Sequence, residues 1–256
     1  MAITIWAEMC AKDFEDVDPM QTIAIFPTAA TEQHGPHLPL GTDSMIAEGM
    51  LEELQRQNPA DLDLRVLPVQ AIGKSDEHIW AAGTLTLSAE SALSAWTEIC
   101  KSVARSGVRK IVIVNSHGGN LDLLSILVRR LRIDAAMLAV RCQWGAFGAP
   151  EDIYSEQENT HGLHGGDVET SMMLAFRPET VRMEFAKDFR SSAESSLLPP
   201  TGAVASGWIA RDLNPDGVVG EAHLATAQKG RATASHQVRG FIEMLRAVAG
   251  SPLPDP

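Results

Sequence analysis

The chain has 256 residues, of which 45% are hydrophobic and 21% are charged, and its formal net charge is −12. This length fits one large domain over residues 1–256, and the hydrophobic share is sufficient for a packed core, so a disordered chain is excluded. The negative charge argues against a nucleic-acid partner and against an anionic membrane surface, because both would repel the protein.

The N-terminal segment and the cysteines indicate a cytoplasmic protein. The opening residues, MAITIWAEMC, have no basic start followed by a long apolar run, so we predict no signal peptide. No stretch reaches the roughly 18 apolar residues that a membrane span needs. Cys10, Cys100 and Cys142 are too few for a disulfide framework and are expected to be free thiols in a reducing compartment.

Apolar runs alternate with helical patterns over the first half of the chain. The patterns predict strands at 22–28, 64–73, 109–116 and 135–142, and helices at 42–58, 88–107 and 120–132. Ser88 is a suitable N-cap and Gly107 a suitable stop for the second helix, whereas Pro68 indicates a bend or an edge in the second strand. Such repeats predict an α/β fold with a mainly parallel sheet between two helical layers.

The second half of the chain is less regular. Residues 145–165 are rich in glycine and polar residues, which is typical of a long loop or a lid. A short helix is predicted over 168–179, irregular structure over 184–221, and a closing helix over 221–248. Glycines inside the closing helix weaken that last prediction.

Two of the predicted strands are followed by loops that carry metal-binding residue types. PTAATEQHG follows the strand at 22–28, and NSHGGN follows the strand at 109–116. Ligands bind beyond the carboxyl ends of parallel strands, so Glu32, His34, Asp43 and His117 are expected at one rim of the sheet. Glu32 and His34 are two residues apart and would point the same way on an extended segment.

A third segment, HGGDVETS, adds His164 and Glu169. Each residue also has an ordinary explanation: Asp43 could be a helix N-cap, Glu169 a first-turn helix charge, and the others loop residues. Taken together they form a ligand set of nitrogen and oxygen atoms without cysteine. Such a set suits zinc, manganese or iron and argues against a structural zinc site rich in cysteine.

The motifs TEQHGPHLPLGTD, NSHGGN and HGGDVETS resemble those of the creatininase (creatinine amidohydrolase) family. GKSDEHIWAAGTLTLS and ATAQKG are weaker matches, and together the motifs span residues 27–230 in the family's order. The resemblance implies a three-layer α/β/α fold, a homo-oligomer that is often a hexamer, and a site for two divalent metal ions. It also implies that Glu32, Asp43 and His117 bind one ion and that His34 and Asp43 bind the other, with Asp43 bridging.

Two positions depart from creatininase proper. Gly119 stands where creatininase carries a carboxylate, so Glu169 is the expected replacement ligand for the second ion. Leu163 stands where creatininase carries a glutamate before the histidine of HGG. The chain is therefore more similar to the wider branch of the family, which has HGGN and a Glu in an ETS motif, and creatinine itself is not the expected substrate.

These observations predict a hydrolase that cleaves an amide, cyclic amide or formamide C–N bond of a small molecule with a metal-bridged hydroxide. Zinc is the first expectation for the ions, with manganese or iron as alternatives. His164 would deliver a proton to the leaving nitrogen. Trp144 and Trp80 would line the substrate pocket unless they belong to the core, and His78 would lie at its rim or reach over from a neighbouring subunit.

Two other interpretations remain open. The chain could be creatinine amidohydrolase proper, or a non-catalytic oligomeric binding protein that keeps the fold and its metal, which Gly119 and Leu163 would favour. The sequence has neither the G-x-S-x-G elbow of serine hydrolases nor the G-x-G-x-x-G of dinucleotide-binding proteins.

Overall fold

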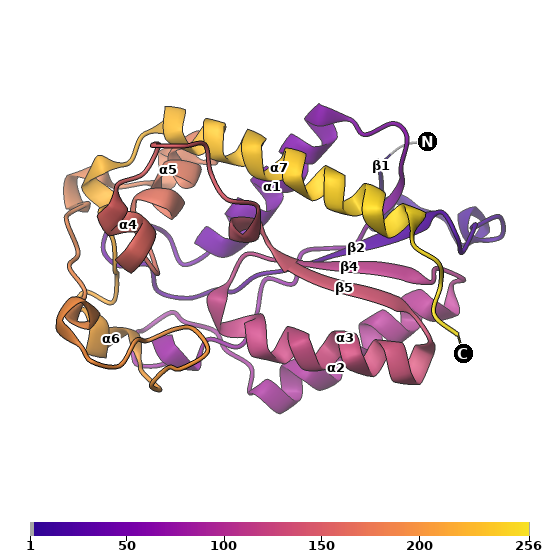
Figure 1. The fold of residues 1–256 in the computed structure, drawn as a ribbon, viewed down its shortest axis with the longest axis horizontal. Helices are drawn as coiled ribbons and strands as arrows, with labels where there is room; N and C mark the ends of the chain where they lie inside the picture. The colour runs from indigo at the N-terminus through magenta and orange to yellow at the C-terminus, as the bar shows by residue number, and fades with distance from the viewer. Residues whose placement is uncertain (1–2, 256) are drawn as a thin grey trace.

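A five-stranded parallel sheet forms the centre of the computed structural model, which describes residues 3–255 (Figure 1). Neighbouring strands pair in parallel in the order β1-β3-β2-β4-β5. The strands are β1 (Ile3–Ile5), β2 (Thr22–Thr28), β3 (Asp63–Val66), β4 (Lys110–Asn115) and β5 (Leu138–Gln143). The chain winds from β2 towards one edge and then crosses back to β4, so the winding reverses between β2 and β4. Such a reversal opens a crevice at the carboxyl ends of the strands.

Helices cover both faces of the sheet, which confirms the predicted three-layer α/β/α architecture. Helices α1 (Thr42–Gln57) and α7 (Ala227–Gly250) lie on one face, and α2 (Ala89–Arg105) and α3 (Leu121–Ala135) on the other (Figure 1). Alternate β2 residues enter different cores, because successive side chains on a strand point to opposite faces. Ile23 and Ile25 pack in the core beneath α1 and α7, while Phe26 packs against Trp96 of α2.

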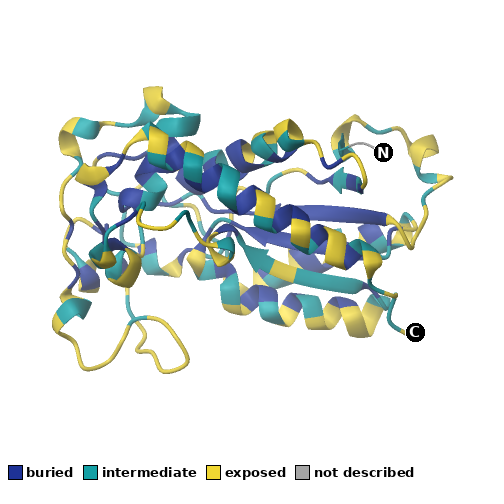
Figure 2. Cartoon of the chain, turned by 45° about the horizontal axis from the view of Figure 1, so that its top comes forward, coloured by how far each residue is buried: buried dark blue, intermediate teal, exposed yellow. Residues whose placement is uncertain are grey.

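The central strands β2 and β4 are buried along their whole length (Figure 2). One member of β4 is a lysine. The Nζ atom of Lys110 donates hydrogen bonds to the carbonyl oxygens of Val248 and Ala249 at the end of α7, at 3.0 and 2.6 Å. These are carbonyls that a helix end leaves without intrahelical partners. The buried Lys110 side chain therefore links β4 to the C-terminal end of α7.

The second half of the chain is more ordered than its composition predicts. The segment 145–165, predicted to be a long loop or a lid, contains helix α4 (Glu156–His161) and is therefore partly helical. Helix α5 (Asp167–Phe176) ends before Pro178 as expected, and the irregular region contains the short helix α6 (Ala210–Leu213). Short 3-10 turns fill other connections: Trp6–Glu8, Ala11–Phe14, Asp76–His78, Gly118–Asn120, Trp144–Phe147, Pro178–Thr180, Met183–Phe185, Ser192–Ser195 and Ala222–Leu224.

The closing helix begins later than predicted, at Ala227, because the hydroxyl of Thr226 caps it by accepting a hydrogen bond from Lys229 N. Gly230 lies inside this helix for a packing reason. A Cβ atom there would be 1.9 Å from the carbonyl oxygen of Ser171 in α5, so only glycine allows α5 and α7 to approach this closely.

Two differences concern the strands β1 and β3. Strand β1 was not predicted, because its three residues are too short to form a recognisable pattern. The predicted strand at 64–73 ends at Val66, two residues before Pro68, which has no N–H to donate. Among the described residues, no helix combines the length and the apolar character needed to cross a bilayer.

Candidate metal centre and active site

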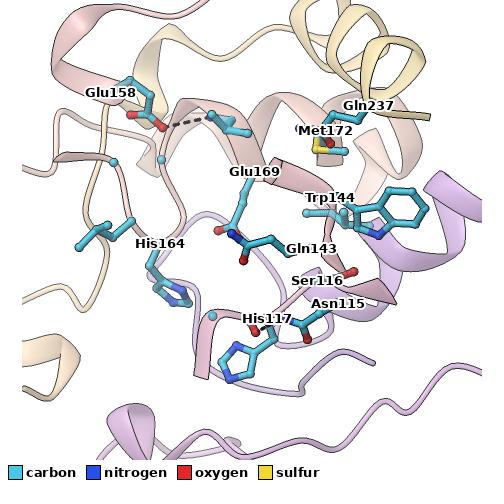
Figure 3. Close-up of a pocket in the computed structure, with 17 residues that line it drawn as sticks. Asn115, Ser116, His117, Gln143, Trp144, Glu158, His164, Glu169, Met172 and Gln237 are labelled. Carbon is cyan, nitrogen blue, oxygen red and sulfur yellow. Dashed lines mark hydrogen bonds between the residues drawn. The ribbon is translucent and has the colours of Figure 1, made fainter. Parts of the chain in front are cut away.

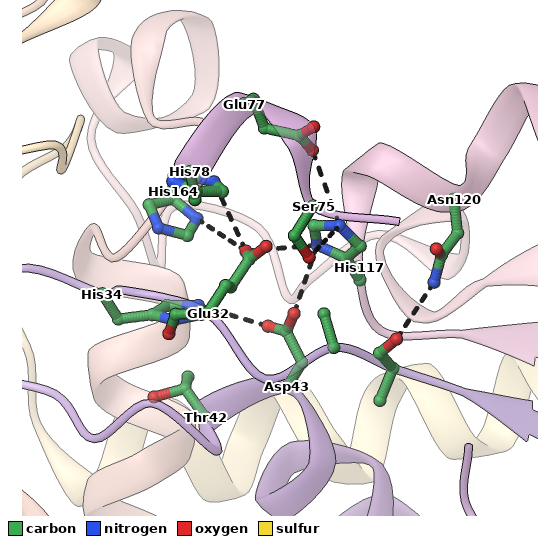
Figure 4. Close-up of polar contacts among 12 residues, drawn as sticks. Glu32, His34, Thr42, Asp43, Ser75, Glu77, His78, His117, Asn120 and His164 are labelled. Atoms are coloured by element: carbon green, nitrogen blue, oxygen red, sulfur yellow. Dashed lines mark hydrogen bonds and ion pairs between the residues drawn. The ribbon is translucent and has the colours of Figure 1, made fainter. Parts of the chain in front are cut away.

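Asp43 lies at the centre of a buried cluster beyond the carboxyl ends of β2 and β4 (Figure 4). Its Oδ1 atom is 3.2 Å from His34 Nε2, and its Oδ2 atom is 3.2 Å from His117 Nδ1. Gly41, not Asp43, occupies the N-cap position of α1, and no side chain caps that helix. The N-cap explanation for Asp43 is therefore wrong: its carboxylate faces two imidazoles that come from different loops.

Glu32 is completely buried and is surrounded by imidazoles. Its Oε1 atom is 3.2 Å from His117 Nδ1, 3.4 Å from His78 Nε2 and 3.6 Å from His164 Nδ1. His78 was expected at the rim or from a neighbouring subunit, but here it lies inside the cluster of its own chain. The structure thus brings together segments that are up to 132 positions apart in sequence, from Glu32 to His164.

Glu169, in the first turn of α5, completes the opposite side of the cluster. Its Oε2 atom is 3.7 Å from His34 Nε2 and accepts a hydrogen bond of 2.6 Å from Gly165 N. Within the described residues, three sets of side chains place donor atoms close enough to hold an ion: Glu32–His34–His164, Glu32–Glu77–His117 and His34–Asp43–Glu169. The last set agrees with the ligand expected to replace the carboxylate absent at Gly119.

The carboxylates favour positive charge at this site. Burial by itself would lower the pKa of His34, but Asp43, Glu169 and Glu32 attract the charged form and raise the pKa to about 9. Burial opposes protonation of His117 too, yet Glu32 and Asp43 raise its pKa well above the ordinary value. Burial would raise the pKa of Glu32, but its imidazole neighbours, His117 above all, lower it. The site therefore stabilises positive charge, which protons on His34 and His117 supply in the metal-free protein.

Several atoms of the cluster lack hydrogen bonds although they are buried. Both carboxylate oxygens of Glu32, His34 Nε2 and Asp43 Oδ2 make none within the described part of the chain. Buried polar atoms are almost always paired, because an unpaired one costs about 1–3 kcal/mol. These are also the donor atoms that face one another in the cluster. The residues present therefore fit divalent ions bound by nitrogen and oxygen.

His164 is held with one ring nitrogen available to the cluster. Its Nε2 atom is 2.7 Å from the carbonyl oxygen of Gln33, which fixes Nε2 as the protonated nitrogen and leaves the Nδ1 lone pair facing Glu32. Burial, followed by the neighbouring imidazoles of His34 and His78, lowers the pKa of His164 well below its ordinary value. The ring is therefore neutral at neutral pH.

A cavity of about 310 Å³ adjoins this cluster (Figure 3). His117, His164 and Glu169 form part of its wall, so the cavity opens directly onto the candidate metal centre. Trp144 also lines it and packs against Phe241, with ring centroids 4.8 Å apart, so this residue belongs to the cavity wall and to the core at once. The remaining wall is mixed: Ile46, Val168 and Met172 are apolar, and Asn115, Ser116, Gln143, Glu158 and Gln237 are polar.

Trp80 lies apart from that cavity wall. Its ring is covered by the guanidinium group of Arg211, 4.4 Å from the ring centroid. A role for Trp80 in substrate binding stays a prediction. Asn120 occupies the N-cap position of α3, but its side chain does not cap that helix. It donates to the carbonyl oxygen of Ala29 and accepts from Lys74 N, so it joins the loops that follow β2, β3 and β4.

Sequence reasoning missed Glu77, whose Oε1 atom is 3.5 Å from His117 Nε2. The stretch SDEH was noted only for His78. A carboxylate next to a candidate site histidine was the available indication, but the place of Glu77 beside His117 depends on the path of the loop between β3 and α2.

The comparisons with known proteins agree with this geometry. The family model described as creatinine amidohydrolase matches residues 7–245. The chain belongs to the creatininase family. This confirms the resemblance drawn from the three motifs and extends it over nearly the whole chain.

The relatives that match along most of their length are hydrolases. A mycofactocin precursor peptide peptidase of Mycobacterium ulcerans is 32% identical, over 90% of this chain and 86% of that protein. The creatinine amidohydrolase of Pseudomonas putida is 25% identical, over 88% of each chain. A crystal structure of creatinine amidohydrolase superposes with a TM-score of 0.76 at 21% identity, covering 97% of this chain and 99% of that one, which establishes the shared fold.

Proposed function

We propose that the protein is a metal-dependent hydrolase that cleaves the C–N bond of an amide in a small substrate. One observation carries the proposal: the two oxygens of Asp43 lie 3.2 Å from imidazole nitrogens of two different histidines, His34 and His117. A single carboxylate placed in this way suits a pair of ions. Two divalent ions held there would lower the pKa of a water molecule and polarise an amide carbonyl.

The ligands divide into two overlapping sets. Glu32, Asp43 and His117 would hold one ion, and His34, Asp43 and Glu169 the other, with Asp43 common to both. Zinc, manganese and iron all accept such ligands, and zinc remains the first expectation. Related solved creatininases include a Zn–Zn form at 21% identity and a manganese form at 20%.

His164 is the proposed proton carrier. Its neutral ring presents the Nδ1 lone pair to the cluster, while the bond from Nε2 to the carbonyl of Gln33 fixes the ring orientation. The ring would take a proton from the attacking water at Nδ1 and return it to the leaving nitrogen, so that the proton inventory balances over one turnover.

The cavity indicates which part of a substrate fits. Within the described residues neither Lys nor Arg lines it, and two carboxylates, Glu158 and Glu169, do. A carboxylate or phosphate placed there, away from the candidate metal centre, would have neither Lys nor Arg to pair with, and an unpaired charge is costly to bury. We infer that the group bound in this part of the cavity carries no negative charge and is partly apolar, in keeping with Ile46, Trp144 and Met172.

A peptide bond is the second candidate, because the relative at 32% identity is a precursor peptide peptidase. Cleavage of a non-peptide amide remains the first candidate, and creatinine itself is disfavoured by Gly119 and Leu163. A non-catalytic metal-containing binding protein is the remaining alternative.

A homo-oligomer, expected as a hexamer, also stays a prediction. Apolar side chains lie unusually exposed in the single chain, among them Leu197 (99% exposed), Val204 (68%) and Ile79 (67%). Exposed apolar surface of this kind is often covered by a partner. Light scattering coupled to size-exclusion chromatography would measure the mass in solution.

The deciding experiment is an amide-hydrolysis screen with and without a chelator. The purified protein, loaded with zinc or manganese, is offered formamides, cyclic amides, simple acyl amides and neutral dipeptides. Turnover that disappears with chelator and returns with metal supports the hydrolase, and the preferred class distinguishes peptide from non-peptide cleavage. Ligand binding without turnover of any class would replace this proposal with the non-catalytic alternative.

A further inference from the structure

His117 faces different partners through its two ring nitrogens. Nδ1 points to the carboxylates of Glu32 and Asp43, each at 3.2 Å, whereas Nε2 points to the turn that follows β3 (Figure 4). On that side the carbonyl oxygen of Lys74 is 2.8 Å away and Glu77 Oε1 is 3.5 Å away. Nε2 therefore donates to the carbonyl oxygen of Lys74, and Nδ1 is the ring nitrogen directed at the candidate metal centre.

The Glu77 carboxylate is fixed in this place. Its side chain is 11% exposed, and its Oε2 atom accepts a hydrogen bond of 2.9 Å from Lys74 Nζ. A buried carboxylate with a single lysine partner on one oxygen leaves the other oxygen directed at His117 Nε2. This carboxylate faces Nε2, the ring nitrogen that does not point to Asp43, so its position suits support of the His117 ring.

Gly119 provides the space for this contact. A Cβ atom at residue 119 would lie 2.0 Å from Glu77 Oε1, 2.5 Å from His117 Nε2 and 2.6 Å from the carbonyl oxygen of Lys74. Any side chain would therefore separate the three groups, so glycine is required here for lack of room. This position is one of the two at which the sequence departs from creatininase proper.

We propose that Glu77 is a positioning residue for His117, and that Gly119 is glycine so that the Glu77 carboxylate can reach the Nε2 edge of the ring. The inference rests on the proposed metal centre. A carboxylate behind a metal-binding histidine fixes the tautomer and ring orientation and strengthens electron donation from the other nitrogen. Glu77 thus acts through His117 and does not touch the ions.

The test measures metal affinity directly, by competition with a chromogenic chelator using zinc alone, and records the visible spectrum of the cobalt-loaded protein. Loss of such a carboxylate typically weakens metal binding by about 10–100-fold. Because the Lys74 carbonyl remains as a partner, we expect about a tenfold loss for one ion in Glu77→Gln, with unchanged stoichiometry and a shifted cobalt spectrum. Glu77→Asp, which keeps the charge, should recover part of the affinity.

Asp76→Asn is the matched control. Asp76 belongs to the same turn and lies 3.8 Å from Lys74 Nζ, but its side chain is 55% exposed, so its removal changes the net charge equally without affecting His117. We expect its zinc affinity to stay within about twofold of the parent, because solvent screens an exposed charge. Unfolding of each chelator-treated variant, followed by circular dichroism, separates loss of affinity from loss of fold.

The outcomes distinguish this inference from the proposed function. If the parent protein binds two ions and Glu77→Gln keeps its affinity, or Asp76→Asn loses as much, the positioning role is wrong while the metal centre stands. If Glu77→Gln loses one ion completely, Glu77 is a direct ligand, which also overturns the positioning role. If the parent binds no ion at all, the proposed function and this inference fail together.

Discussion

Replacing Asp43 with asparagine is the most direct perturbation of the proposed metal centre. The change keeps the shape of the side chain and removes the one negative charge that lies 3.2 Å from both His34 Nε2 and His117 Nδ1. Each ion would lose an anionic ligand, whereas substitution of a residue that binds a single ion would affect only that ion. We therefore expect both ions and the hydrolytic activity to disappear together in Asp43→Asn.

The size of the effect follows from the separation of the charges. Two unit charges about 4 Å apart interact by about 4 kcal/mol at an effective dielectric constant near 20. At about 1.4 kcal/mol for each factor of ten, this corresponds to roughly a thousandfold weaker binding of each ion, before the double charge of the ion is considered. The metal-free variant should also show a pKa of His34 below the value of about 9 in the parent, because Asp43 is the strongest of the groups that raise it.

The assay combines metal analysis after dialysis, competition with a chelator, and amide hydrolysis on the same samples. Asp63→Asn is a suitable control, because Asp63 begins β3 and accepts a hydrogen bond of 2.6 Å from Thr22 Oγ1, away from the carboxyl ends of the strands where the cluster lies. That variant should retain both ions. An Asp43→Asn protein that kept two ions per chain and the parent turnover would refute the shared-carboxylate arrangement.

Four further outcomes are expected. Glu169→Gln should weaken one ion selectively, so metal analysis should find close to one ion per chain, and equal loss of both would contradict the assignment of Glu169 to a single ion. His164→Ala should keep both ions and lower the turnover number by about 10²–10⁴-fold, whereas loss of an ion would make His164 a ligand. Because the pKa of His34 is raised to about 9 without metal, an incoming ion displaces its proton at pH 7. Metal affinity should therefore rise by about tenfold per pH unit for each displaced proton up to about pH 9 and then level off, as measured by calorimetry in buffers of different ionisation enthalpy. The same shift makes the metal-free protein lose stability as the pH rises from the ordinary histidine value of 6.5 through about 9, which thermal unfolding would detect.

Local sequence patterns determined the layers of this protein and the identity of most of its candidate site residues. The apolar runs that became β2 and β4 were recognisable because a strand buried on both faces needs continuous apolar side chains. Ser88 was recognisable as the cap of α2 because serine directly before a helical pattern commonly caps the first turn. In the structure its hydroxyl accepts from Ser91 N. The polar loops after those strands marked the rim of the sheet, since the rule for parallel sheets depends only on strand direction.

The tertiary structure alone decided how these loops meet. The order β3-β2-β4 places the loops that follow these three strands side by side, and no local pattern encodes that order. For this reason sequence reasoning could not find Glu77 behind His117, could not place His78 against Glu32 within one chain, and could not tell whether Asp43 capped a helix or faced two imidazoles. Each of these outcomes depends on contacts between residues distant in sequence, which strand order and helix packing determine.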